Sequence, residues 1–421
     1  MKRKILILSI VSMITASVAI DSCKKSNPAP LDLGTLMAGS VDLNAASAPT
    51  GVPVNPTISA IFTTEVDGTT ATASNITLTE DYDAVSIPLT ISVSGKIVTI
   101  TPAANLANGS LYVLAITTGL KATDGETLIA INRSFTTVGS FLPAGVTAYW
   151  NFDGNANDQT GTFNPSSGGI TDITYVSGRN ATAGQAASFN GSTSLIEIPN
   201  GDVLENSSDF SLSFWVKEDS TSKRDQFVMG LSGWYGFQFE INNNGNNKLG
   251  ECKLAVQYSL SNGKTDSQDL WFNGAATNTT LNNGGWQGWT FSKDLTSNNG
   301  TGVNGLLAKQ WAHIVCTYNH TTKIGTMYIN GQKVKEQDFN LYGVTHNMYI
   351  ATGVKFAGNA ANNSFVFGFI QDKVSPTIPD SWADYTIPGN GHFQGLLDDV
   401  AVYHSVLTPA IITLMYNSGK P

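Results

Sequence analysis

Short runs in which apolar and polar residues alternate recur along this chain, and turn-forming Gly, Asn and Pro separate them. Residues 97–101, 111–116 and 325–329 are examples. Alternation with a period of two places every second side chain on one face of a strand, whereas a helix requires a period near 3.6. Because long helical periodicities are missing, the sequence predicts an all-β protein.

The composition limits the classes of partner. The 421 residues are enough for two or three domains. The formal net charge is −9 at pH 7, and no cluster of Lys and Arg interrupts the acidic balance. Proteins that bind nucleic acid carry basic patches, so we expect no nucleic-acid partner.

The first 22 residues have the features of a secretion signal. Basic residues at positions 2–4 precede an apolar run at 5–20 that is too short to span a membrane as a mature helix. The junction at Cys23 resembles the lipoprotein signals of Bacteroidetes-type bacteria. That resemblance implies cleavage before Cys23 and its lipidation, with residues 23–37 as a lipid-anchored tether. Ordinary signal-peptidase cleavage is the alternative.

The two remaining cysteines, Cys252 and Cys316, each lie in a strand-like run. In an exported protein they are candidates for a disulfide. Two small buried hydrophobic side chains are an equal alternative. No Cys-x-x-Cys pair suggests zinc.

Residues 38–139 are expected to form one β-sandwich of about 100 residues. The segments 53–58, 100–102 and 135–137, with Tyr112 between them, resemble the bacterial Ig-like domain of surface-layer and surface-lipoprotein proteins. The resemblance implies a spacer, and nothing in this segment suggests chemistry.

Residues 143–421 are expected to form a second, larger β domain. Its marks are, in order, Trp150 with Asp153, Phe-Asn-Gly at 189–191, Phe-Ser-Leu-Ser-Phe-Trp-Val at 210–216, Trp-Ala-His-Ile-Val at 311–315, Tyr-Ile-Asn-Gly at 328–331, and Gly-Leu-Leu-Asp-Asp-Val-Ala-Val-Tyr at 395–403. In this order they resemble the laminin-G-like jelly roll of the concanavalin A-like lectin/glucanase superfamily. That superfamily contains lectins, adhesins and enzymes, so the resemblance implies a fold more than a function.

The last of these motifs contains Asp398, which alternation places on one face with Val400 and Val402. A carboxylate facing a core is costly unless it is paired or binds a metal. The resemblance implies a structural calcium where the first and last strands meet, with Asp398, Asp153 and the carbonyl of Gly191 as candidate ligands. A side chain bonded to backbone amides is the alternative.

Two long insertions, residues 219–308 and 353–391, carry tryptophan and tyrosine amid Asn, Gln and Gly. Aromatic rings offer flat apolar faces to the C–H groups of sugars, and amides and carboxylates pair with hydroxyls. The candidates for carbohydrate contact are, in order of preference, Trp286, Trp289, Trp271, Trp234 and Tyr235. For any single tryptophan, a place in a small core is the alternative.

The sequence lacks the Glu-x-Asp-x-Glu pattern with which laminarinase-type glucanases of this superfamily place nucleophile and acid. Alternation also puts Asp398 and Asp399 on opposite faces, which excludes them as a catalytic pair. Lone carboxylates such as Glu240, Asp266 and Asp269 could still meet in space, but no catalytic residue is predicted.

The sequence therefore predicts an exported lipoprotein, anchored by lipid at the outer membrane or cell surface, whose Ig-like spacer presents a jelly roll that captures a poly- or oligosaccharide without cleaving it. In organisation the chain is similar to the glycan-binding accessory lipoproteins of Bacteroidetes polysaccharide-uptake systems, which implies components of such a system as partners. A surface adhesin that binds a protein is the first alternative. A glycoside hydrolase with an unrecognised site is the second.

Overall fold

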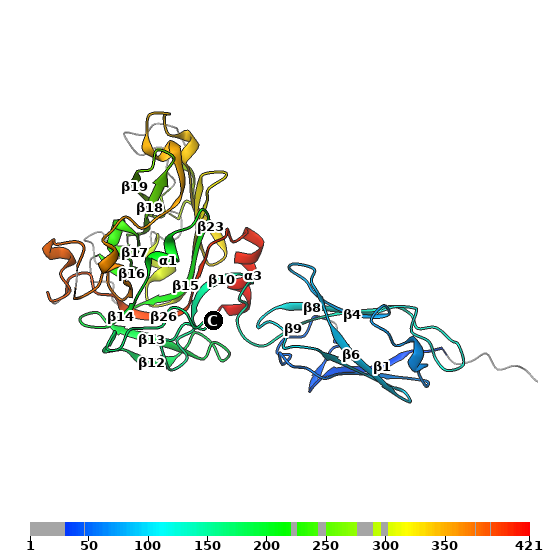
Figure 1. Cartoon of the computed structure of the whole chain (residues 1–421). Helices are drawn as coiled ribbons and strands as arrows, with labels where there is room; N and C mark the ends of the chain where they lie inside the picture. Colours follow the sequence, from blue (N-terminus) through cyan, green and yellow to red (C-terminus); the bar gives the residue numbers. More distant parts are fainter. Residues whose placement is uncertain are drawn as a thin grey trace, which may run out of the picture.

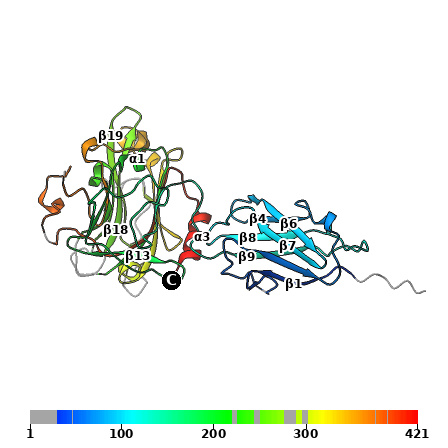
Figure 2. The same ribbon diagram turned by 60° about the horizontal axis from the view of Figure 1, so that its bottom comes forward.

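The computed structural model describes residues 30–421 except 46, 220–224, 243–249, 276–288, 296–301, 375 and 388. Two β-sandwiches follow one another along the chain, and helix α3 (Pro409–Gly419) lies on the side of the second that faces the first (Figures 1 and 2). The prediction of an all-β protein is confirmed. Among the described residues, no helix is long and apolar enough to cross a membrane.

The first sandwich consists of a five-stranded sheet in the order β2-β1-β3-β7-β6 and a four-stranded sheet in the order β5-β4-β8-β9. On β8, alternate residues Tyr112, Leu114 and Ile116 are buried, as alternation predicts. The strands are β1 (Leu33–Ala38), β2 (Val41–Asp42), β3 (Ile58–Phe62), β4 (Ile76–Glu80), β5 (Ser86–Ile87), β6 (Leu89–Ser94), β7 (Ile97–Pro102), β8 (Leu111–Ile116) and β9 (Ile131–Thr136).

The first sandwich begins earlier than residue 38. Leu31 is fully buried in its core, and β1 pairs with β3 along its length. The predicted tether, residues 23–37, therefore includes a strand of the sandwich, because the apolar side chains of Leu31 and Leu36 complete its core.

The second sandwich is larger. One sheet, which we call the back sheet, has the order β12-β13-β26-β15-β21-β22-β23-β20, with β10 also paired to β26. The other, the front sheet, has the order β11-β14-β25-β16-β17-β18-β19, with β24 also paired to β18. The back-sheet strands are β10 (Val146–Trp150), β12 (Thr174–Ser177), β13 (Gln185–Asn190), β15 (Phe210–Glu218), β20 (Trp289–Ser292), β21 (Trp311–Asn319), β22 (Ile324–Ile329), β23 (Gln332–Asp338) and β26 (Gln394–Tyr403). The front-sheet strands are β11 (Ile170–Thr171), β14 (Leu195–Ile198), β16 (Gln226–Gly230), β17 (Phe237–Asn242), β18 (Glu251–Leu260), β19 (Thr265–Phe272), β24 (Ala351–Val354) and β25 (Phe365–Phe367), and the short helices are α1 (Asp202–Glu205) and α2 (Asn304–Leu307).

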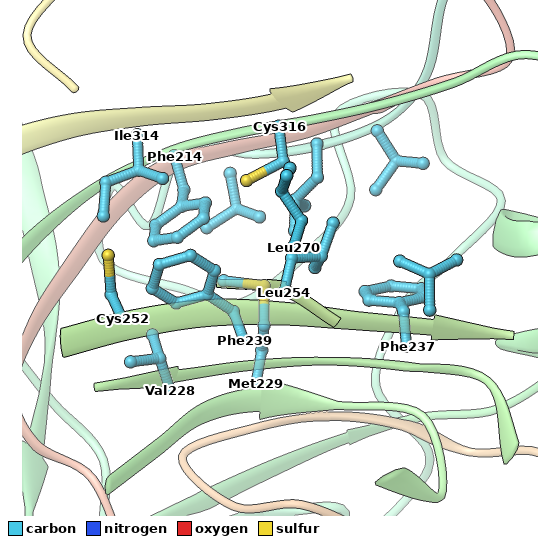
Figure 3. Packing of buried hydrophobic residues seen from close by; sticks show 14 of the residues in the cluster. Phe214, Val228, Met229, Phe237, Phe239, Cys252, Leu254, Leu270, Ile314 and Cys316 are labelled. Atoms are coloured by element: carbon cyan, nitrogen blue, oxygen red, sulfur yellow. The ribbon is translucent and has the colours of Figure 1, made fainter. Parts of the chain in front are cut away.

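The core of this domain lies between the two sheets (Figure 3). Phe214 from the back sheet meets Phe239 from the front sheet edge to face, with ring centroids 4.9 Å apart. Cys252 and Cys316 lie in the same layer on opposite sheets, and both are free and buried. The structure contains no disulfide between them, so they act as small hydrophobic side chains. Burial raises the pKa of both thiols, which keeps them protonated.

Strand β26 does not alternate as the sequence predicts. Its pairing with β15 shifts register between Ser213 and Trp215, and Asp399 opposite this shift has φ 46°. Such a β-bulge adds one residue to one strand and turns the following side chains to the other face. Leu397 and Val400 therefore both face the core. The predicted face shared by Asp398 and Val400 is wrong.

Candidate functional site

The outer face of the front sheet carries polar and aromatic side chains at every second position. On β17, Gln238 and Glu240 point away from the core, between the inward Phe237, Phe239 and Ile241. Antiparallel pairing sets Glu240 opposite Lys253 on β18, and Lys253 opposite Trp271 on β19. The register therefore brings a carboxylate, an ammonium and an indole into one row across three strands.

Two adjoining cavities of about 450 Å³ each lie over this row. They share Lys253, so we treat them as one site and call it the groove from here on. A volume of this size is typical of small-ligand sites. The first cavity is lined by Asp225, Phe227, Trp234, Gln238, Glu240, Lys253, Trp382 and residues 389–391, and the second by Glu251, Lys253, Asp269, Trp271 and Trp289.

Tryptophan rings stand at both ends of the groove. At one end, Trp234 stacks on Trp382 with ring centroids 5.7 Å apart and an interplanar angle of 26°. At the other end, the centroids of Trp271 and Trp289 are 5.7 Å apart at 32°. Paired rings of this kind hold each other in fixed orientations, so each end presents a preformed apolar surface.

The predicted aromatic residues do not all reach the groove. Trp234, Trp271 and Trp289 line it, whereas Tyr235 does not line it and stacks on Trp234 at a centroid distance of 5.8 Å. Trp289 is only 5% exposed, because it packs between Trp271 and the ammonium of Lys335, 3.5 Å from its ring. Trp286, the first choice from the sequence, lies outside the described residues.

The structure adds groove residues that were not among the predicted contacts, including Asp225, Gln238, Glu251, Lys253 and Trp382. The sequence contained a signal for one of them, Gln238. Gln238 and Glu240 are the polar members of an alternating run, Phe-Gln-Phe-Glu-Ile, which places both on the solvent face of one strand. Trp382 is one of the aromatic residues that marked the second insertion, although it was not among the preferred contacts, and it comes from the short 3₁₀ turn Ser381–Ala383.

The centre of the groove is an ionic cluster. Lys253 Nζ lies 3.3 Å from Glu240 Oε2 and 3.5 Å from Asp269 Oδ2. Burial lowers the pKa of Lys253, but the two carboxylates outweigh it and raise the pKa overall, so the ammonium stays charged. Burial raises the pKa of Glu240, and Lys253 opposes that shift.

Of the three lone carboxylates noted in the sequence, Glu240 and Asp269 lie close together in the structure, whereas Asp266 lies apart from them. Glu240 and Asp269 converge on Lys253 from neighbouring strands. Asp266 instead accepts a hydrogen bond of 2.9 Å from Asn347 Nδ2 and does not line the groove.

Asp398 lies far from the groove in a separate buried network. Its Oδ2 pairs with Nη1 of Arg179, which follows β12, and Arg179 Nη2 lies 2.5 Å from Asp399 Oδ2. Arg179 Nε donates to the carbonyl of Gly419 at the end of α3, 2.6 Å away. The expectation that Asp398 and Asp399 point to opposite faces is wrong, because the bulge turns both carboxylates toward one guanidinium.

The described side chains around Asp398 form an ion-pair network and not a set of calcium ligands. Arg179 already supplies the positive charge that a cation would bring, and a second cation beside it would be repelled. Asp153 accepts hydrogen bonds from the backbone N of Gln185 at 2.7 Å and from Asn151 Nδ2 at 2.8 Å. Within the described part of the chain, no three His, Cys, Asp or Glu side chains gather as metal ligands.

Calcium binding by Asp398, Asp153 and Gly191 stays a prediction of the resemblance, and a melting experiment tests it. Because Arg179 compensates Asp398, we expect the same Tm in excess calcium and in excess chelator. A calcium-dependent rise in Tm that disappears in Asp398→Asn would contradict this expectation and establish the metal site.

Comparisons with known proteins define the class of each domain. The model of the bacterial Ig-like domain matches residues 41–137. The model of the concanavalin A-like lectin/glucanases superfamily matches residues 190–374. The chain therefore carries a bacterial Ig-like domain followed by a concanavalin A-like jelly-roll domain, which confirms the predicted order of folds. A search of curated proteins found no match.

Several solved structures resemble the chain at low identity. Domain 4 of AbnA, a GH43 extracellular arabinanase from Geobacillus stearothermophilus in complex with arabinotriose, is 20% identical with a TM-score of 0.37, over 65% of this chain and 98% of that one. The binding domain of Paraclostridial Mosquitocidal Protein 1 is 16% identical with a TM-score of 0.40, over 65% and 52%. The receptor binding domain of botulinum neurotoxin type G is 14% identical with a TM-score of 0.37, over 65% and 51%. The chain spans about half the length of the two toxin domains.

Proposed function

We propose that the jelly-roll domain binds a poly- or oligosaccharide non-covalently in the groove. The observation that carries this proposal is the combination of preformed tryptophan surfaces at both ends with carboxylates between them, all on the outer face of a packed sheet. Indole rings stack on the C–H faces of sugars, and carboxylates accept hydrogen bonds from sugar hydroxyls. A sheet holds these groups in place, so little ordering is needed on binding.

A hydrolase is the second candidate, because Glu240 and Asp269 approach each other. Both contact Lys253, so their nearest oxygens are at most about 7 Å apart, a range that includes carboxylate spacings found in retaining and in inverting glycosidases. Lys253 contacts both carboxylates, whereas glycoside hydrolysis by either mechanism needs one carboxyl group free to donate a proton to the leaving oxygen. Capture without cleavage is therefore the function that the groove supports better. Release of new reducing ends from a bound polysaccharide would favour the hydrolase.

The proposal includes the setting of the domain. Lipidation of Cys23, which lies outside the described residues, would anchor the exported chain at the outer membrane or cell surface. The Ig-like domain would then hold the jelly roll away from the lipid. Many anchored copies on one membrane would gain avidity for a polymeric glycan. Components of a polysaccharide-uptake complex are the protein partners that we propose on the same grounds.

A glycan array tests the proposed function. The soluble chain from residue 30 keeps β1 and Leu31, which complete the first sandwich. We expect it to retain one or a few polysaccharides and to lose them when the groove tryptophans are replaced. Binding to a protein ligand that survives enzymatic deglycosylation, with no retention of any glycan, would contradict the proposal and support an adhesin.

A further inference from the structure

We propose that the groove selects glycans without acidic groups and rejects uronate, sulfated and sialylated chains. This inference rests on the proposed function, since it names the class of sugar that the same groove accepts. Three observations support this proposal. The described lining is negatively charged, its ammonium group is already ion-paired, and one buried side-chain oxygen accepts no hydrogen bond from any described residue.

The described lining residues carry four carboxylates and one ammonium, a formal excess of three negative charges. The carboxylates belong to Asp225, Glu240, Glu251 and Asp269, and the ammonium to Lys253. These charged groups are close enough to influence each other electrostatically. The negative charges of Asp225 and Asp269 contribute to the raised pKa of both Glu240 and Glu251, after the larger effect of burial. An anionic ligand would enter this same negative potential.

Among its described lining residues, the groove also offers no free cation to an anion. Lys253 is the only cation among the described lining residues, and its Nζ already contacts Glu240 and Asp269 at 3.3 and 3.5 Å. Lys335 contacts the ring of Trp289, but it is only 1% exposed and lines neither cavity. Recognition of carboxylate or sulfate typically uses an accessible arginine or lysine. The described lining lacks this feature.

Gln238 supplies an independent indication of what the ligand brings. Its side chain lines the first cavity and is only 4% exposed. Nε2 donates to Glu240 Oε2 at 3.2 Å, which fixes the orientation of the amide. Oε1 is buried and accepts no hydrogen bond from any described residue. A buried acceptor of this kind favours a ligand that donates, as a hydroxyl does and an ionised acid group does not.

The test first compares neutral with acidic polysaccharides, and then compares the neutral and oxidised forms of one polymer. The mature full chain is assayed by affinity electrophoresis against neutral polysaccharides (arabinan, galactan, mannan and β-glucan) and acidic ones (polygalacturonate, alginate and chondroitin sulfate). We expect every retained polymer to be neutral. Oxidation of the primary hydroxyls of a retained hexose polymer to carboxylates should weaken binding by about tenfold or more at low salt, and added salt should reduce the difference.

Charge variants show whether the lining causes the discrimination. The double variant Asp225→Asn/Glu251→Gln removes the two negative charges that do not contact Lys253, and Asn tolerates the left-handed backbone at residue 225, where φ is 50°. The ratio of neutral to oxidised affinity should fall several-fold in this variant. It should not change in Asp124→Asn, which removes an exposed charge of the Ig-like domain.

The outcomes separate the two proposals. Retention of an acidic polymer that is lost in Trp234→Ala/Trp271→Ala would overturn the charge selection while the binding function stands. Failure to retain any polymer of either class would overturn the binding function and this inference with it. Unchanged discrimination in Asp225→Asn/Glu251→Gln would overturn the role assigned to the lining.

Discussion

Replacement of Arg179 by methionine is expected to destabilise the jelly-roll domain by about 3–5 kcal/mol, the typical cost of removing one partner of a buried ion pair. Arg179 pairs with both Asp398 and Asp399, and its guanidinium lies 4.6 Å from the centroid of the Trp215 ring. Without it, two carboxylates remain together in a buried site with no cation. Urea-induced unfolding measures the loss as a shift of the transition midpoint.

Two further variants make the Arg179 prediction specific. Arg133→Met removes an arginine from the Ig-like domain, where no ion pair of that residue is present among the described residues, and should change stability by less than about 0.5 kcal/mol. Addition of Asp398→Asn and Asp399→Asn to Arg179→Met should recover part of the loss, since it removes the uncompensated charges. Stability of Arg179→Met equal to that of the wild type would contradict the assigned role.

Replacement of Trp234 and Trp271 by alanine is expected to weaken polysaccharide binding by about 100-fold or more. Each ring stands at one end of the groove, and loss of one central aromatic contact typically costs about 2 kcal/mol, or roughly 30-fold. The two single variants should each show part of the loss. Isothermal titration with the polysaccharide retained on the array measures all three.

A matched control separates loss of the surface from loss of the fold. Trp311 is half-buried at the start of β21 in the back sheet and does not line the groove. Trp311→Ala should bind like the wild type, and the Tm of every variant reports whether it is folded. A folded Trp234→Ala/Trp271→Ala variant with wild-type affinity would place the binding site elsewhere on the molecule.

Much of the fold follows from local alternation. The core faces of β8, β15 and β21 coincide with the alternating apolar positions, because side-chain direction along a regular strand depends only on the backbone. The exceptions have physical causes. The bulge at Asp399 breaks the period of two in β26. Helix α3 follows Thr408, whose side chain caps the helix by accepting a hydrogen bond from Ile411 N.

The sequence predicted the type of residue that forms the groove but not the set of residues that come together there. Aromatic residues in the first insertion, such as Trp234 and Trp271, marked it as a place for sugar contacts. Strand pairing, such as that between β18 and β19, decides which of these residues share a surface. The approach of the two sheet edges also contributes, because it brings Trp289 next to Trp271. The partners Glu240, Lys253 and Asp269 come from three strands, so no one stretch of sequence contains the cluster.

The sequence alone determined that this protein consists of an Ig-like sandwich and a jelly roll, because strand periodicity and turn residues are local properties of the chain. It also identified Asp398 as a charge that needed compensation. Only the tertiary structure decided what compensates it, since Arg179 lies 219 residues away along the chain. The bulge then turns Asp399 to the same guanidinium, and a carboxylate expected to bind a metal is part of an ion-pair network between β26 and the segment after β12.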